Sequence, residues 1–175
     1  MPRTSQEEKT RRGMAGEFLV AAELNRRGFQ AAVTFGSAKR ADVYALDSES
    51  DRLARIEVKS TREGSRKWVL GQRVLDRKTW SENVFWVLVK LPDPHPPTAD
   101  TTDEIRGRHA ARFYVFTSKE IGEHVQGLHE EYVRRFRERN GREFEGPGVL
   151  QLPTSDAQEC ENRWDKLAVY LRLDR

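Results

Sequence analysis

The chain has 175 residues, of which 37% are apolar or aromatic and 34% are charged, a composition that predicts one soluble globular domain over residues 1–175. The longest apolar run, 84–89, is far too short to cross a bilayer, and the polar N-terminus gives no sign of a signal peptide. Cys160 is the only cysteine, which excludes an internal disulfide and favours the reducing cytoplasm.

The first part of the chain predicts a helix followed by a strand. Ser5 and Glu8 are expected to form a capping box, in which the serine caps the helix and the glutamate reaches back. Apolar residues at helical spacing then continue to Gly28, which is suited to follow the end of a helix. Residues 29–35 follow as a predicted strand, and 36–40 form a polar turn.

Two segments rich in β-branched and aromatic residues, 41–46 and 55–61, predict a β-hairpin, because the segment 47–51 has the composition of a turn. If the hairpin closes about Glu49 and Ser50, one face carries the apolar pairs that period-two alternation requires, namely Ala41–Val58, Val43–Ile56 and Ala45–Ala54. Glu-Ser is a poor two-residue turn, so we expect a longer or bulged loop.

The other face of the predicted hairpin pairs Asp42 with Glu57, and Lys59 lies two residues further along the second strand. Like charges on directly opposed residues are destabilising unless something compensates them. A divalent cation would do so, since carboxylate oxygens are the ligands that Mg²⁺ prefers. The alternative is a solvated hairpin face, on which these three residues are only neighbours.

Glu17 lies in the predicted first helix, on the border of its apolar face. A carboxylate there is either a border residue that reaches solvent or a third acid that faces the acidic pair on the strands. The sequence leaves both interpretations open.

The second part of the chain predicts a buried central strand and a helical C-terminal region. Nearly every residue of 84–91 is apolar, which is typical of a strand that is buried on both faces. The segment before it is ambiguous between helix and strand, since Gly71 interrupts it. After this strand we expect a proline-rich surface loop at 92–108 and a strand at 113–116. A helix from Ser118 to near Gly141, a loop at 143–153 and a helix from Ser155 toward Trp164 and Leu167 should follow. The core of the domain is expected over about 5–118, and 119–175 is expected to be a helical elaboration.

Positive charge is concentrated in the first part of the chain, where residues 1–80 carry 17 Lys and Arg against 11 Asp and Glu. Residues 81–175 carry 14 against 17, so the net charge of +3 conceals an uneven distribution. Cations near an acidic pair suit phosphate binding. Six cations follow the hairpin, and we favour phosphate contact over a solvated face for them: Arg62, Arg66, Lys67, Arg73, Arg77 and Lys78. Trp68 and Trp80 lie among them, and we expect these tryptophans to anchor the core.

Three short motifs follow one another in the first part of the chain. They are Gly16-Glu17 with Ala21, Ala22 and Leu24 in the opening helix, Gly36-Ser37 followed by 41–43, and the acidic-x-Lys strand 56–60. Together they resemble the PD-(D/E)XK nuclease superfamily, and in motif its archaeal Holliday-junction-resolvase-like branch. The resemblance covers roughly residues 13–61, and it departs from the pattern at Ala41, where the superfamily's name has proline.

The resemblance implies a restriction-endonuclease-like α/β core of order αβββαβ, with a mixed central sheet flanked by helices and with extra C-terminal helices. It implies that Asp42, Glu57 and the main-chain carbonyl of Val58 bind a divalent metal, that Glu17 adds a contact directly or through water, and that Lys59 orients or activates the attacking water. The implied cofactor is Mg²⁺, for which Mn²⁺ can substitute. The implied partner is DNA, contacted by Ser37, Lys39, Arg40, Arg62, Arg66, Lys67 and Gln72.

We therefore predict a cytoplasmic, divalent-metal-dependent endonuclease that hydrolyses phosphodiester bonds in DNA during restriction, repair, phage defence or junction resolution. Junction resolution would call for a homodimer, because a four-way junction needs two symmetric cuts. The alternative is a catalytically inactive fold relative that binds nucleic acid or a protein. The chain has no glycine-rich phosphate loop and no dinucleotide fingerprint, which argues against a nucleotide-dependent enzyme.

Overall fold

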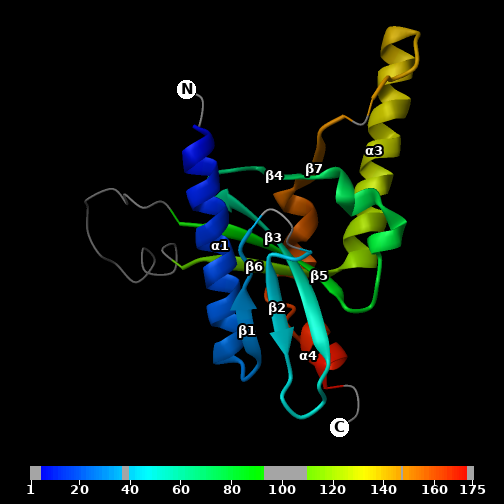
Figure 1. Ribbon diagram of the computed structural model, residues 1–175. Helices are drawn as coiled ribbons and strands as arrows, with labels where there is room; N and C mark the ends of the chain where they lie inside the picture. The colour runs from blue at the N-terminus through cyan, green and yellow to red at the C-terminus, as the bar shows by residue number, and fades with distance from the viewer. Residues whose placement is uncertain (1–4, 37–39, 93–109, 147, 173–175) are drawn as a thin grey trace.

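The centre of the molecule is a five-stranded mixed sheet with the strand order β1-β2-β3-β5-β6 (Figure 1). The structure is a computed structural model that describes residues 5–36, 40–92, 110–146 and 148–172. β3 runs parallel to β5, and the other neighbouring strands of this sheet are antiparallel. The strands are β1 (Gln30–Val33), β2 (Val43–Leu46), β3 (Leu53–Arg62), β5 (Val84–Leu91) and β6 (Arg112–Thr117). The expected mixed sheet flanked by helices is therefore confirmed.

The helix α1 (Gln6–Arg26) precedes the sheet and begins where the sequence predicts. The Ser5 hydroxyl caps it by accepting a hydrogen bond of 3.1 Å from the Glu8 backbone N–H. The helix ends before Gly28, whose φ of +89° is a left-handed conformation that glycine adopts without steric cost. Its buried residues pack on one face of the sheet.

The hairpin of β2 and β3 has the predicted register. Val43 lies opposite Ile56 and Ala45 lies opposite Ala54, so the expected apolar face is present. The loop 47–52 joins the two strands, which confirms that the connection is longer than a two-residue turn.

The segment between β3 and β5 forms a short strand and two 3₁₀ turns, where the αβββαβ order expects an α-helix. β4 (Lys67–Leu70) alternates exposed and buried side chains, and η1 (Gln72–Leu75) and η2 (Arg77–Thr79) follow it. β4 pairs with β7 (Leu150–Pro153) in a separate antiparallel sheet. The prediction of a loop over 143–153 is therefore wrong for β7, because the glycines and prolines around it hid a strand whose partner is distant in the sequence.

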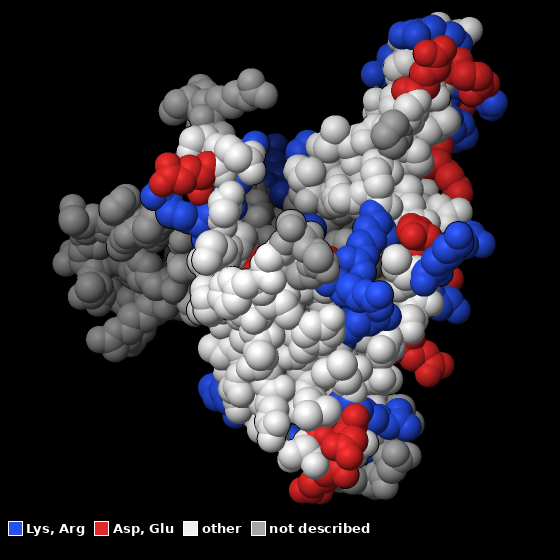
Figure 2. Space-filling view, viewed as in Figure 1, with Lys and Arg blue, Asp and Glu red and all other residues white. Residues whose placement is uncertain are grey.

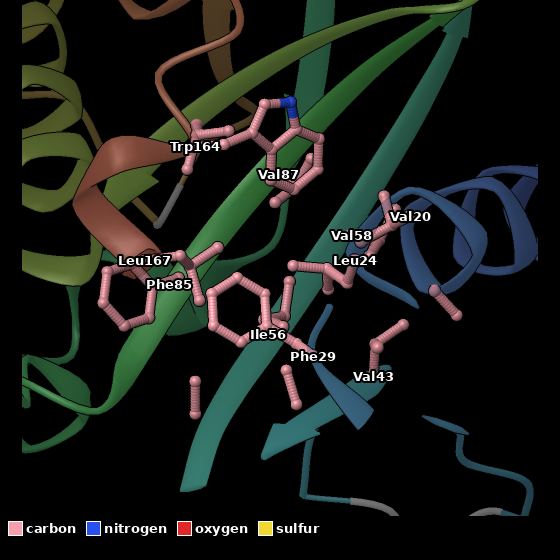
Figure 3. Close-up of a cluster of buried hydrophobic side chains, with 14 of the residues drawn as sticks. Val20, Leu24, Phe29, Val43, Ile56, Val58, Phe85, Val87, Trp164 and Leu167 are labelled. Atoms are coloured by element: carbon pink, nitrogen blue, oxygen red, sulfur yellow. The ribbon is translucent and has the colours of Figure 1, made fainter. Parts of the chain in front are cut away.

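One face of the five-stranded sheet is covered by α1 and by α4 (Asp165–Leu171). Figure 3 shows Leu24 of α1 and Leu167 of α4 in one cluster with Ile56 of β3 and Phe85 of β5. The two ends of the described chain therefore meet over the same hydrophobic core.

The opposite face of the sheet carries a second buried cluster, to which β4, β7 and α3 (Ser118–Asn140) contribute. Trp68 of β4 is 1% exposed, and its ring meets that of Tyr114 edge-on at 5.2 Å between centroids. The Trp68 indole N–H donates to the Val89 carbonyl at 3.2 Å, so the expectation that this tryptophan anchors the core is confirmed. Trp80 is half-buried.

The helix α3 is longer than the part of it that packs on the sheet. It begins at Ser118, as the sequence predicts, and Thr117 caps it in a capping box with Glu120. Its far end extends away from the body of the molecule (Figure 1). Two arginines there, Arg134 and Arg135, form ion pairs with Glu131 of the same helix, each at 2.6 Å.

The predicted final helix is divided in two. A 3₁₀ helix, η3 (Thr154–Cys160), occupies its first part, and the short helix α4 forms its second part. Among the helices that the structure describes, none is both long enough and apolar enough to span a bilayer.

Candidate active site

Glu57 and Lys59 share the face of β3 that is directed toward the second cluster. In the parallel ladder they pair with Trp86 and Leu88 of β5, which belong to that cluster. Val58 between them belongs to the cluster under α1. Strand alternation therefore explains why an acid and a lysine two residues apart point to the same side.

Asp42 lies at the entry to β2 and is 7% exposed. Its backbone N–H donates to the Ile56 carbonyl at 2.9 Å, and the Thr34 N–H donates to its carbonyl at 3.0 Å. Its carboxylate is directed at β3, where Oδ2 accepts a hydrogen bond of 2.8 Å from the Val58 N–H. The backbone of β3 therefore fixes the position of this carboxylate.

The ammonium group of Lys59 lies between the acid of β2 and the backbone of β3. Its Nζ is 3.8 Å from Asp42 Oδ2 and donates to the Val58 carbonyl at 3.1 Å. The same nitrogen is 5.7 Å from the centre of the Trp86 ring, within the range of a cation–π attraction. A positive charge is thus placed against two of the oxygens that the sequence suggested as metal ligands.

Glu57 is 8% exposed and is held by an arginine from the segment that follows β4. Arg73 Nη1 lies 2.7 Å from Glu57 Oε1, and Arg73 Nη2 donates to the Arg40 carbonyl at 2.9 Å. Because Arg40 is two residues before Asp42, this guanidinium connects the acid of β3 to the segment that carries the other acid.

The sequence did not single out Arg73. It was one of six cations after the hairpin, and its return to Glu57 depends on where β4 lies. β4 in turn is positioned by its pairing with β7. The contact of Arg73 with Glu57 therefore depends on tertiary structure, and the residues next to Arg73 in the sequence do not indicate it.

Glu17 reaches the region from a different side. It lies on α1, which covers the face of the sheet opposite to Glu57 and Lys59. It is half-buried and lines a hollow of about 260 Å³ with Thr34 and Gly36, among others. Since Thr34 also bonds to the Asp42 backbone, the hollow adjoins the Asp42 segment, and the role of Glu17 stays a prediction.

The donor set contains two carboxylates. In the described part of the chain, no three His, Cys, Asp or Glu side chains gather closely enough to hold a metal ion. Mg²⁺ nevertheless suits a smaller set, because proteins commonly bind it through one or two carboxylates together with waters and substrate phosphates. The donor chemistry of Asp42, Glu57 and the Val58 carbonyl is therefore of the kind that Mg²⁺ accepts, and their binding of one ion stays a prediction.

The basic residues of the segment around and after the end of β3 differ in their surroundings. Arg62 forms an ion pair with Glu8 of α1, while Arg66 and Lys67 are exposed where β4 begins. Figure 2 shows Lys and Arg side chains gathered on the part of this face where η1 and η2 lie in Figure 1. The expectation that these residues contact phosphate stays a prediction.

The remaining residues suggested as DNA contacts differ in their surroundings. Arg40 is exposed, and Gln72 donates through Nε2 to the Gly148 carbonyl at 3.2 Å, which ties it to the segment before β7. Ser37 and Lys39 lie outside the described residues.

Comparison with solved structures gives matches that include two nucleases. The chain is similar to a bacterial homing endonuclease, I-Ssp6803I, with 15% identity, a TM-score of 0.46 and coverage of 94% of this chain and 92% of that one. It is also similar to Hjc, a Holliday junction resolvase of Archaeoglobus fulgidus, with 13% identity, a TM-score of 0.45 and coverage of 87% and 93%. No protein-family model and no curated protein matches the chain. What the chain does therefore has to follow from its own residues.

Proposed function

We propose that this protein is a divalent-metal-dependent endonuclease that hydrolyses phosphodiester bonds in DNA. The observation that supports this most directly is the pair of buried carboxylates, Asp42 and Glu57, which are 7% and 8% exposed on adjacent strands. Removing an ionised group from water costs several kcal/mol even when it is paired. Two such acids beside Lys59 are therefore not explained by their contribution to folding stability, whereas they suit a site that binds a cation.

The residues divide into metal ligands and groups that act on the substrate. Asp42, Glu57 and the Val58 carbonyl would hold Mg²⁺, or Mn²⁺ in its place, and Glu17 would add a contact directly or through water. When bound, the metal lowers the pKa of coordinated water and neutralises charge on the phosphate. Lys59 would orient the attacking water and stabilise the charge that grows on the phosphate oxygens.

The cations around the acids favour DNA as the substrate. Arg40, Arg66 and Lys67 are exposed near the acidic strands, and each can pair with a backbone phosphate. We place the protein in the cytoplasm because its single cysteine suits a reducing compartment. A homodimer belongs to this proposal if the substrate is a four-way junction.

The test is cleavage of linear, single-stranded and branched DNA by the purified protein with Mg²⁺, with Mn²⁺ and with a chelator. Asp42→Asn and Glu57→Gln keep the shape of each side chain and remove its charge. We expect each substitution to lower the cleavage rate by about 10²-fold or more, because the metal loses an anionic ligand. Glu159→Gln, which changes an exposed acid of η3, should cut at the wild-type rate.

The alternative, a catalytically inactive relative that binds nucleic acid or a protein, predicts no cleavage. If the wild type leaves all three kinds of DNA intact with either metal, while its melting curve shows a folded protein, the endonuclease proposal is wrong. DNA binding by that inactive protein would then identify it as a nucleic-acid-binding relative.

A further inference from the structure

Arg73 combines a backbone that is held by hydrogen bonds with a side chain that is partly exposed. Its carbonyl accepts hydrogen bonds from Thr79 Oγ1 and from the Asp76 N–H, both at 3.1 Å. The next residue, Val74, is 1% exposed in the second cluster. The Arg73 side chain, by contrast, is 41% exposed, so it can change partners without a change in the fold.

The partners of Arg73 are the groups that the proposed reaction needs. Its guanidinium touches the Glu57 carboxylate at 2.7 Å and the Arg40 carbonyl at 2.9 Å. A divalent cation bound to Glu57 would stand beside this guanidinium, and two positive charges so close repel each other. The metal and Arg73 therefore compete for the same carboxylate.

A guanidinium that leaves Glu57 has an obvious alternative partner in the proposed substrate. Its planar fork of donors matches two oxygens of a phosphate, which lysine cannot do as a point charge. Because Arg73 sits at the rim of the acidic site, it can reach a phosphate of DNA bound there without leaving the region.

We propose that Arg73 is a substrate-binding residue with two states: it pairs with Glu57 in the metal-free protein and binds a DNA phosphate once metal has displaced it. This inference rests on the proposed metal-dependent function. DNA binding would then depend on the metal, because metal binding to the acids releases Arg73, and the released guanidinium binds the DNA backbone.

Arg77 provides a matched control four residues further along. It carries the same charge on the neighbouring turn, but its Nη2 donates to Gln126 Oε1 at 3.2 Å and its guanidinium lies 5.4 Å from the centre of the Trp80 ring. Removing Arg77 therefore changes the net charge of this surface without touching Glu57.

The first measurement is Mn²⁺ binding in the absence of DNA, by calorimetry or electron paramagnetic resonance. Arg73→Gln should bind Mn²⁺ about three- to tenfold more tightly than the wild type, since the competing cation is gone. Arg77→Gln and Arg73→Lys should stay within about twofold of the wild type, the first because it is remote and the second because it keeps a charge at Glu57. Melting curves establish that each variant is folded.

The second measurement is the salt dependence of DNA binding, with a chelator and with Ca²⁺, a hard cation that also prefers oxygen ligands. With Ca²⁺, Arg73→Gln should lower the slope of log K against log salt by about one unit, the contribution of one phosphate contact. With a chelator the slope should not change, because Arg73 is then engaged with Glu57.

The outcomes separate this inference from the function on which it rests. If the wild type binds Mn²⁺ and cuts DNA but Arg73→Gln binds Mn²⁺ no more tightly, the inference is wrong and the endonuclease stands. A slope that falls equally with and without Ca²⁺, or in neither condition, also overturns it. If Arg73→Gln binds Mn²⁺ where the wild type does not, competition by Arg73 is supported even though the wild type is inactive. If neither protein binds Mn²⁺, both proposals fail.

Discussion

At the scale of single residues, each of the two acids already has a positive partner from the chain itself. Lys59 Nζ lies 3.8 Å from Asp42 Oδ2, and Arg73 Nη1 lies 2.7 Å from Glu57 Oε1. Such pairing offsets the free energy that burial of a carboxylate costs. Under the proposed function, the same pairing would have to be rearranged when a divalent cation enters, so these two cations would set how tightly the acids bind the metal.

Replacing Lys59 tests this arrangement. Lys59→Met keeps the apolar stem near Trp86 but leaves the Asp42 carboxylate without its nearest ammonium, so we expect the metal-free protein to lose about 1 kcal/mol of unfolding free energy. Mg²⁺ should raise the melting temperature of this variant more than that of the wild type, because the metal supplies the missing charge. Cleavage should fall by about 10²-fold even with saturating Mg²⁺.

Lys119→Met serves as the control, since Lys119 is an exposed lysine of α3 and does not belong to the basic segment after the hairpin. A Lys59→Met protein that melts and cuts like the wild type would show that Lys59 neither balances Asp42 nor takes part in the reaction.

The sequence predicted that the two acids and the lysine lie together on the hairpin, but it did not predict that Arg73 contacts Glu57. Asp42, Glu57 and Lys59 could be placed together because the apolar residues between them alternate along two adjacent strands. Arg73 belongs to a turn whose position depends on tertiary pairing, and all arginines in the basic segment look alike in a local window. Glu17 lies between these cases, since its helix was predictable from the sequence but its role toward the acids stays a prediction.

At the scale of elements, local signals predicted α1 and the β2–β3 hairpin, whereas long-range pairing decided β4 and β7. Ser5 and Gly28 mark both ends of α1 because caps act on their own helix. Neither β4 nor β7 has a neighbour in the sequence with which to pair, and each buries only alternate side chains. The pairing of two such strands can be recognised only when the positions of the other elements are known.

The contact between α1 and β3 supplies a prediction at this scale. A Cβ placed on Gly16 would lie 1.8 Å from Ser60 Oγ and 3.1 Å from Ser60 Cβ, so the helix approaches the strand too closely for a larger residue. We expect Gly16→Ala to destabilise the protein by about 1–3 kcal/mol, although alanine favours a helix over glycine. Ser60→Gly in the same chain should recover much of the loss, as measured by denaturant unfolding.

Gly13 is the matched control on the same helix, because a Cβ there would meet nothing within 4 Å. Gly13→Ala should stabilise the protein by up to about 1 kcal/mol through helix propensity alone. Equal effects of the two substitutions would mean that α1 and β3 are not packed closely at Gly16.

At the scale of the whole molecule, cations and acids are arranged unevenly. Two arginines toward the far end of α3 are balanced by acids of the same helix, since Arg134 lies 2.6 Å from Glu131 and 2.7 Å from Glu138, and Arg135 lies 2.6 Å from Glu131. The basic residues after the hairpin include three exposed cations on η1 and η2, namely Arg73, Arg77 and Lys78, and Figure 2 shows Lys and Arg side chains gathered on the face where η1 and η2 lie. A polyanion should therefore bind near the acidic strands rather than along α3.

The salt dependence of DNA binding tests this distribution. Lys67→Gln removes an exposed cation from the start of β4, and we expect the slope of log K against log salt to fall by about one unit. Lys119→Gln removes a cation from α3 that lies 3.9 Å from Glu123, and it should leave the slope unchanged. If the two substitutions act alike, binding follows the net charge of the protein and not a particular face.

The pairing of β4 with β7 also governs the order in which the protein can be completed during its synthesis. The ribosome delivers β4, with Trp68 and Leu70, long before the partner strand that ends at Pro153 has been made. The helix α4, which closes the other core with Leu167, emerges later still. Part of the cover on each face of the central sheet is thus made later than α3, so the acids of β2 and β3 are made well before the elements that complete the two cores around them.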